Sequence, residues 1–296
     1  RVRKQRIRMT KFTDLNLAPK VLKAITEAGY ESPTPIQAGA IPPALEGRDV
    51  LGIAQTGTGK TASFTLPMIT LLSKGRARAR MPRSLVLAPT RELAAQVAEN
   101  FDTYTKHLKL TKALLIGGVS FKEQDALIDR GVDVLIATPG RLLDHFERGK
   151  LLLTGAQIMV VDEADRMLDM GFLPDVRRVL ERLPEKRHNL FFSATMPPDI
   201  VDLAATILTD PKKVEVSRES STAEGITQRL IFVDKAGKKE LLEQLANDPR
   251  VKRALVFMRT KHAANRIVER LKKRGIETAA IHGNKSQNAR ERALNG

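Results

Sequence analysis

The chain has 296 residues, of which 42% are hydrophobic and 28% charged, the composition of a folded protein of about two domains. It contains no cysteine, which excludes disulfides and thiolate metal sites, and no apolar run approaches the roughly 20 residues that cross a bilayer, so we expect a cytoplasmic protein. The formal net charge of +16 favours a polyanionic partner, although basic surfaces also arise without one.

Two clusters of basic residues stand out near the beginning of the chain. One lies in residues 1–9, which we interpret as a basic N-terminal extension, and the other in a predicted loop. We interpret both as solvated segments that attract polyanions without specific contacts. The loop cluster comprises Lys74, Arg76, Arg78, Arg80 and Arg83.

From about residue 50, short aliphatic runs alternate with longer helical patterns, which is typical of parallel βαβ units. The pattern predicts an α/β domain over residues 10–212, with a parallel sheet flanked by helices. Ligands of such sheets gather at the carboxyl ends of the strands, so motifs at those ends carry functional weight. The predicted strands are 50–54, 84–88, 111–116, 132–137, 158–161 and 189–193.

A serine-rich stretch without apolar periodicity, residues 213–225, is predicted to be an interdomain linker. A second α/β unit begins at 226, with predicted strands at 226–233, 254–258 and 278–281 and a basic helix over 261–274. Only about 70 residues follow the linker, which is short for a doubly wound domain. We therefore expect residues 226–296 to be the N-terminal part of a second domain.

The first predicted strand runs into a glycine-rich loop and then an apolar helix. The loop reads Ala54, Gln55, Thr56, Gly57, Thr58, Gly59, Lys60, Thr61. Its glycines allow backbone amides and a helix N-terminus to face phosphates. Lys60 would supply charge for the β and γ phosphates of ATP, and the Thr61 hydroxyl would be a ligand of Mg²⁺. Ala54 stands where the generic pattern has glycine.

About a hundred residues later, another apolar strand ends in Asp162-Glu163-Ala164-Asp165. Taken alone, these acids would more often cap a helix N-terminus. Beside a phosphate-binding loop they are predicted to be catalytic: Asp162 to hold Mg²⁺, and Glu163 to orient or deprotonate the attacking water.

With this spelling, the two motifs resemble the DEAD-box family of RNA-dependent ATPases. The resemblance implies RecA-like domains with a P-loop NTPase core. Within the family, the chain most resembles the bacterial RhlE subgroup. The family's adenine-reading segment matches residues 29–37, with Phe12 placed 17 residues before Gly29. By this resemblance, Gln37 reads the adenine edge, and Phe12 and Tyr30 lie near the base; an amide suits that role because it both donates and accepts.

Three further strand ends match family segments that line the RNA strand. Small residues, hydroxyls and backbone amides there can hold successive phosphates. Such contacts recognise the RNA backbone and hardly distinguish one base from another. Any one of these segments alone is equally compatible with an ordinary turn. The matching residues are Pro89, Thr90 and Arg91, then Gly117 and Gly118, then Thr138, Pro139, Gly140, Arg141 and Leu142.

The resemblance also covers a coupling motif and part of the second unit. Ser193 and Thr195 match the element that links the ATP state to the RNA state, with hydroxyls expected near Asp165. Gln287 and Arg290 match an element of the second RecA-like domain. The family's arginine-finger motif is expected beyond Gly296, and such fingers contribute about 10³ to 10⁵ in rate, so we expect this chain to hydrolyse ATP poorly.

The expected function is ATP-dependent local unwinding of short RNA duplexes by a monomer. ATP and RNA would bind cooperatively and hydrolysis would permit release. Candidate protein partners are those of ribosome assembly or RNA decay. Two alternatives stay open at this stage: an ATP-gated RNA clamp or annealing protein that does not unwind, and a DNA translocase built on the same domains.

Overall fold

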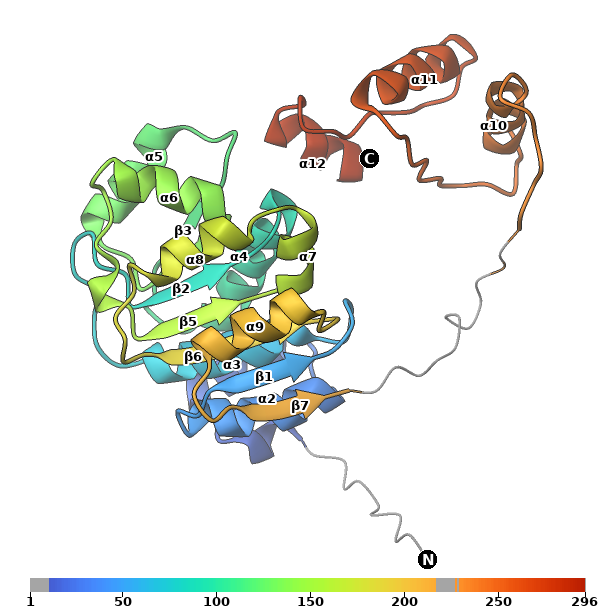
Figure 1. Cartoon of the computed structure of the whole chain (residues 1–296). Helices are drawn as coiled ribbons and strands as arrows, with labels where there is room; N and C mark the ends of the chain where they lie inside the picture. Colours follow the sequence, from blue (N-terminus) through green and yellow to red (C-terminus); the bar gives the residue numbers. More distant parts are fainter. Residues whose placement is uncertain (1–10, 217–226, 228, 296) are drawn as a thin grey trace, which may run out of the picture. The chain divides into compact units, whose positions relative to one another are not determined.

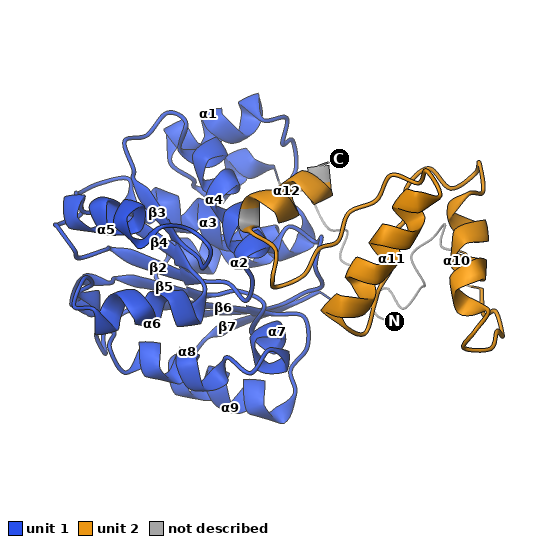
Figure 2. Cartoon of the chain, turned by 90° about the horizontal axis from the view of Figure 1, so that it is seen from above, with its two compact units in different colours: residues 1–220 blue, residues 221–296 orange. Residues whose placement is uncertain are grey.

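The computed structural model describes residues 11–216, 227 and 229–295. The chain divides into two compact units, residues 1–220 and residues 221–296 (Figure 2). The expected basic extension at 1–9 and most of the expected linker lie outside the described residues. Each unit is considered by itself below.

The first unit is built on a seven-stranded sheet in which every pairing is parallel (Figure 1). The strand order across the sheet is β3-β4-β2-β5-β6-β1-β7. Parallel neighbours require crossover connections, which helices supply here. The strands are β1 (Val50–Ile53), β2 (Ser84–Leu87), β3 (Lys112–Leu115), β4 (Val134–Ala137), β5 (Ile158–Val161), β6 (His188–Ser193) and β7 (Lys212–Glu215).

Helices cover both faces of the sheet. Successive strand residues point to opposite faces, so Val86 packs into one apolar cluster and its neighbours Leu85 and Leu87 into the other. The first cluster lies under η1 (Phe12–Leu15), α1 (Pro19–Glu27), α2 (Pro35–Leu45), α3 (Lys60–Leu72) and α4 (Arg91–Thr105). The second lies under α5 (Phe121–Arg130), α6 (Pro139–Glu147), η2 (Leu153–Gly155), α7 (Ala164–Asp169), α8 (Leu173–Leu180) and α9 (Pro198–Ile207).

This architecture confirms the predicted α/β class and its six strands, whose ends differ from the prediction by at most two residues. The continuous aliphatic pattern was a sound guide because β2, β4 and β5 are buried along their whole length.

The predicted linker at 213–225 is wrong at its start, because residues 212–215 form the edge strand β7 beside β1. Lys212 N donates to Asp49 O at 2.7 Å, and Val216 N donates to Ile53 O at 2.9 Å. The pattern concealed this strand because an edge strand exposes charged residues and packs only one apolar side chain, here Val214.

The predicted solvated loop needs a correction at Arg83, which is buried. Its guanidinium donates to Asp133 Oδ1 at 3.1 Å and to the carbonyl oxygens of Leu72 and Lys74. A buried arginine needs this full set of partners, so Arg83 anchors the loop from inside.

The second unit contains three helices in its described residues, α10 (Lys238–Ala246), α11 (Lys261–Lys273) and α12 (Gln287–Asn295). Helix α11 confirms the predicted basic helix. The three predicted strands are wrong for the described residues, since none of these segments pairs with a neighbour. Phe232 and Phe257 are 90% and 87% exposed, so their apolar pattern is not covered by a second layer there. A strand needs hydrogen-bonded neighbours, which a sequence pattern does not supply.

Candidate functional site

The phosphate-binding loop joins β1 to α3 at the carboxyl edge of the sheet. Gly57 and Gly59 have φ angles of +86° and +89°, a backbone region that other residues rarely adopt. Gly59 is the residue that precedes α3, so the free amides of the first helical turn face the loop. The start of the loop is tied to the sheet, because Ala54 N donates to Ser193 O at 3.1 Å. The loop therefore has the geometry of an anion site.

Asp162 and Glu163 follow β5, two strands away from β1, at the same edge of the sheet. Both are buried, and Glu163 adopts left-handed backbone angles of 51° and 53°. Its Oε1 accepts a hydrogen bond from Thr56 Oγ1 at 3.1 Å, and its Oε2 lies 3.3 Å from the Arg166 guanidinium. Strained backbone of this kind is typical of functional sites. Sequence reasoning missed Arg166, whose only signal was its place directly after the acidic motif.

Two buried polar atoms at this site have no hydrogen-bond partner, Lys60 Nζ and Asp162 Oδ1. Burial raises the pKa of Asp162 to about 7, against the opposing charge of Lys60, while Glu163 adds to the rise. A buried ammonium and a buried carboxyl oxygen without hydrogen-bond partners are costly unless a ligand completes them. Phosphate oxygens would satisfy the first and a divalent cation the second, so the residues present fit magnesium and a nucleotide.

The segment predicted to read adenine lies against the phosphate loop through Gln37. Gln37 is buried, accepts from Thr34 N at 3.0 Å and donates from Nε2 to Gly59 O at 3.1 Å. Phe12 is buried in the core with its ring edge-on to Tyr30, at 6.5 Å between centroids. Tyr30 is partly exposed. The structure thus brings Gln37 to the loop and Phe12 to Tyr30, and the contact of these residues with adenine stays a prediction.

The expected contact between the coupling motif and Asp165 is present. Thr195 N and Thr195 Oγ1 donate to Asp165 Oδ2 at 2.9 and 2.8 Å, and Asp165 N donates to Ser193 Oγ at 3.2 Å. Burial acts to raise the pKa of Asp165, but hydrogen bonds with Thr195 and Ser193 outweigh it and hold that pKa below its usual value. These bonds connect the end of β6 to the start of α7.

The predicted RNA residues of α4 and of the turn after β3 lie close together. Thr90 Oγ1 accepts from Leu93 N at 3.2 Å, which makes it the N-cap of α4. The Arg91 guanidinium lies over Gly117 and Gly118, where a Cβ atom would come within 2.8 Å of its nitrogens. Gly118 also has φ +80°. The two glycines therefore make room for this arginine.

The third predicted RNA segment begins α6. Thr138 is the N-cap residue with extended backbone, and Pro139 is the first helical residue. Gly140 has open space where a side chain would be. Arg141 is half-buried on the first turn. Since β2, β3 and β4 are neighbours, all three segments meet at one edge.

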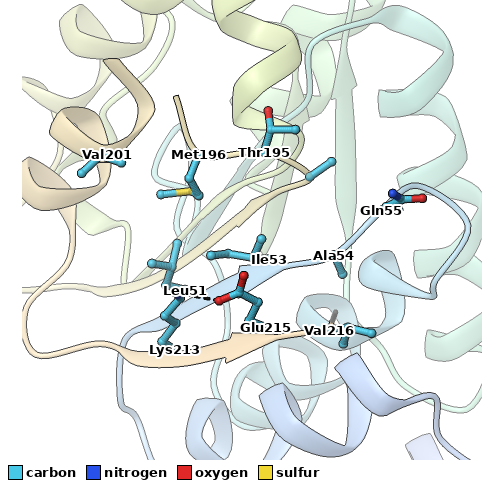
Figure 3. A pocket seen from close by; sticks show the side chains of 11 residues that line it. Leu51, Ile53, Ala54, Gln55, Thr195, Met196, Val201, Lys213, Glu215 and Val216 are labelled. Atoms are coloured by element: carbon cyan, nitrogen blue, oxygen red, sulfur yellow. Dashed lines mark ion pairs between the residues drawn. The ribbon is translucent and has the colours of Figure 1, made fainter. Parts of the chain in front are cut away.

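A cavity of about 490 Å³ in the first unit does not coincide with the predicted nucleotide site (Figure 3). It lies between α9 and the exposed part of β1 and β7, and its rim carries the ion pair of Lys213 and Glu215 at 2.7 Å. Of the predicted site residues, only Ala54, Gln55 and Thr195 line it. Lys60, Asp162 and Glu163 lie outside its lining.

Comparison with protein families settles the classification. The DEAD/DEAH box helicase model matches residues 34–203, more than half of the chain. The chain belongs to the DEAD/DEAH box helicase family. A second family model, Helicase conserved C-terminal domain, matches residues 237–296 in the second unit of this DEAD/DEAH box protein. The 34–203 match contains the loop, the acidic motif and the three segments predicted to bind RNA.

Curated members of the DEAD/DEAH box family resemble the chain over almost its whole length. "ATP-dependent RNA helicase DeaD" of Mycobacterium tuberculosis is 47% identical over 284 residues, 96% of this chain and 50% of that protein. "ATP-dependent RNA helicase RhlB" of Pseudomonas syringae pv. tomato is 41% identical over 294 residues, 97% of this chain and 74% of that protein. The chain thus spans about half the length of the DeaD relatives it matches. These names do not distinguish the RhlE-like subgroup.

A solved structure supports the fold of this DEAD/DEAH box protein. The DEAD box protein of the hyperthermophile Methanococcus jannaschii matches with a TM-score of 0.65 and 34% identity, over 96% of this chain and 76% of that one. The RecA-like fold prediction is therefore confirmed. No helix in the part of the chain that the structure describes is long and apolar enough to cross a membrane.

Proposed function

We propose that this chain acts as an ATP-dependent RNA helicase that binds magnesium-ATP at the phosphate loop and an RNA backbone at the neighbouring strand ends. The observation that carries the proposal is the pair of buried, unpartnered atoms Lys60 Nζ and Asp162 Oδ1 beside a glycine loop. A nucleotide with its cation would supply partners to both atoms.

The residues around this pair have separable roles in ATP hydrolysis. Lys60 and the loop amides hold the β and γ phosphates, and Thr61 and Asp162 would hold magnesium, which neutralises charge that develops on the transferring phosphoryl group. Glu163 accepts a proton from the attacking water, and its bonds to Thr56 and Arg166 orient its carboxylate before substrate arrives.

The arginines at the other strand ends support an RNA backbone as the second ligand. Burial lowers the pKa of Arg141; the charge of Asp144 opposes this, and the positive charges of Arg148 and Arg91 add to the lowering. Like charges gathered at one edge are relieved by an anion, and guanidinium groups match phosphate geometry. Contacts of this kind hold the backbone without reading the bases.

ATP and RNA binding are expected to reinforce one another. The bonds from Thr195 to Asp165 join the acidic motif to the end of β6, so a change at the nucleotide is transmitted through backbone that is already connected. By linkage, ATP then tightens RNA binding by the same factor as RNA tightens ATP binding.

The test uses the 296-residue chain, a fluorescent ATP analogue and a labelled single-stranded RNA. Lys60→Ala should abolish nucleotide binding because the phosphates lose their cation, whereas Glu163→Gln should keep binding and block any turnover. Lys20→Ala, exposed on α1, is the matched control and should change neither. Normal ATP hydrolysis by Glu163→Gln would contradict the general-base role. Equal binding of RNA and DNA of the same length would favour a DNA translocase, since only RNA has 2′-hydroxyls.

A further inference from the structure

A buried glutamine beneath the RNA-facing edge has a fixed orientation. Gln124 on α5 is 2% exposed, and its Nε2 donates to Ile116 O at 3.0 Å. Because that carbonyl can only accept, the amide nitrogen must point toward it and Oε1 must point the other way. Oε1 then faces two nitrogens, Arg141 Nε at 3.0 Å and His145 Nε2 at 2.7 Å.

The orientation of Gln124 determines where His145 carries its proton. His145 is fully buried on α6, and its Nε2 must donate because Gln124 Oε1 is an acceptor. Its Nδ1 lies 3.0 Å from Asp125 Oδ1, and Asp125 Oδ2 accepts from Arg148 at 3.2 Å. Burial lowers the pKa of His145, while Asp125 acts in the opposite direction. His145 thus connects Gln124 to the carboxylate of Asp125, which Arg148 in turn holds.

An aromatic ring completes the node and holds Arg141 from its flat face. The Arg141 guanidinium carbon lies 3.5 Å from the centroid of Phe121, and that of Arg148 lies 4.2 Å from it. Phe121 also contacts His145 edge-on, at 5.0 Å between centroids. A second donor of Arg141, Nη2, bonds to Val119 O. Stacking and hydrogen bonds together leave Arg141 one orientation.

These contacts connect Arg141 to the turn on which Arg91 rests. Gln124 binds the carbonyl of Ile116 and Arg141 binds that of Val119, so both ends of the turn 116–119 are held. The two glycines between them lie under Arg91. The Nη1 of Arg141 makes no hydrogen bond to the described residues, so it is the donor that a phosphate would meet.

We propose that Gln124 and His145 are positioning residues for RNA: a buried donor–acceptor pair that fixes Arg141 and the turn 116–119 in their RNA-binding arrangement before RNA arrives. The inference rests on the proposed RNA-binding function. Fixing a long side chain in advance removes an ordering cost from binding, so the effect should appear in RNA affinity.

The test compares two substitutions of His145 in the 296-residue chain. His145→Leu fills a similar volume but removes the N–H that donates to Gln124. His145→Gln places an amide N–H there instead. RNA affinity, measured by anisotropy of labelled oligouridine with an ATP analogue present, should fall about tenfold in His145→Leu. It should return to within about twofold of wild type in His145→Gln, with nucleotide affinity unchanged in both.

His107 provides the matched control. Its imidazole also pairs with a carboxylate, Glu27, at 3.0 Å, but it lies just beyond the C-terminal end of α4. His107→Leu should leave RNA affinity at the wild-type value. A folded His145→Leu that binds RNA as tightly as wild type would overturn the positioning role while the proposed function stands. A wild-type chain that does not bind RNA would overturn both.

If His145→Leu does not fold, a measurement on the wild-type chain tests the positioning role instead. Nitrogen-15 spectra of the five histidine rings should show His145 protonated on Nε2 at neutral pH. Its ring signals should shift when oligouridine is added, and those of His107 should not. An unprotonated Nε2, or a His145 signal that RNA does not move, would contradict the proposal.

Discussion

At the scale of single residues, the two acids that follow β5 are held in opposite ways. Glu163 has both oxygens bonded, to Thr56 and Arg166, on a left-handed backbone. Asp162, its neighbour, is buried with one oxygen unpartnered. The first arrangement positions a base, and the second leaves a ligand position open. Both arrangements lower stability in the absence of ligand, which is common at functional sites.

The cost at Asp162 can be measured. Its folded pKa of about 7 lies above its ordinary value of 3.8, so its contribution to stability is complete below 3.8 and is lost as pH rises through 7. At pH 7.5 and without magnesium, Asp162→Asn should therefore raise the free energy of unfolding by about 2–4 kcal/mol, measured by urea denaturation. The same variant should weaken nucleotide binding in magnesium. An unchanged or lower stability would contradict the buried, unpaired state of this carboxyl.

At the scale of elements, the edge strand β7 depends on a glycine in a distant helix. An added Cβ at Gly39 of α2 would lie 2.6 Å from Val214 Cγ1. Val214 is the β7 residue that packs against the core, and Asp49 also holds the connection to β7 by accepting from Thr209 N at 2.8 Å. Close approach of α2 is therefore a condition for the seventh strand.

Gly39→Ala tests this packing. Helix propensity alone predicts that alanine stabilises α2 by about 1 kcal/mol. We expect the reverse, a loss of about 1–2 kcal/mol in the free energy of unfolding, because the stiff valine side chain cannot move away easily. Val214→Ala in the same chain should remove the clash, so the double variant should be more stable than the sum of the single changes predicts. A stabilised Gly39→Ala would show that β7 does not need this contact.

At the scale of the first unit as a whole, the buried His145 and the half-buried His188 connect its stability to pH. Burial lowers the pKa of both His145 and His188 below 6.5, although Asp125 opposes this at His145, and the Arg48 carbonyl and Asp49 oppose it at His188. His145 also faces Arg141 and Arg148, which reinforce the lowering.

The sign of the pH dependence follows from these lowered values. Above 6.5 the contribution of the two rings to stability is complete, and it is lost as pH falls toward their folded pKa values, because the unfolded chain then binds protons that the folded chain resists. Between pH 7.5 and 5.5 the free energy of unfolding should fall by about 1 kcal/mol per ring at most. The measurement belongs in the Asp162→Asn variant, which lacks the opposite pH dependence of that carboxyl. His145→Gln combined with His188→Gln should flatten the curve, and a curve of unchanged slope would contradict this origin.

The sequence by itself determined the α/β class and six of the seven strands of the first sheet, and it predicted the chemistry of the loop and the acidic motif. It could do so because a phosphate loop or a buried strand is a contiguous string whose residues act on their immediate neighbours. The same reasoning failed for β7 and for the three strands predicted in the second unit, since strand pairing is a property of two segments.

Only the tertiary structure decided which polar residues are partners across the fold. Arg83 looked like one more exposed cation of a basic loop until Asp133, 50 residues away, was found 3.1 Å from it. Gln124 and His145 carried no local signal, because each reads as an ordinary polar residue on a helix. They become partners because the order β3-β4-β2 brings the ends of three strands to one edge. Gln124 on α5 and His145 on α6 then meet in a buried hydrogen bond. Strand order and burial are set by long-range packing, and a local pattern does not contain them.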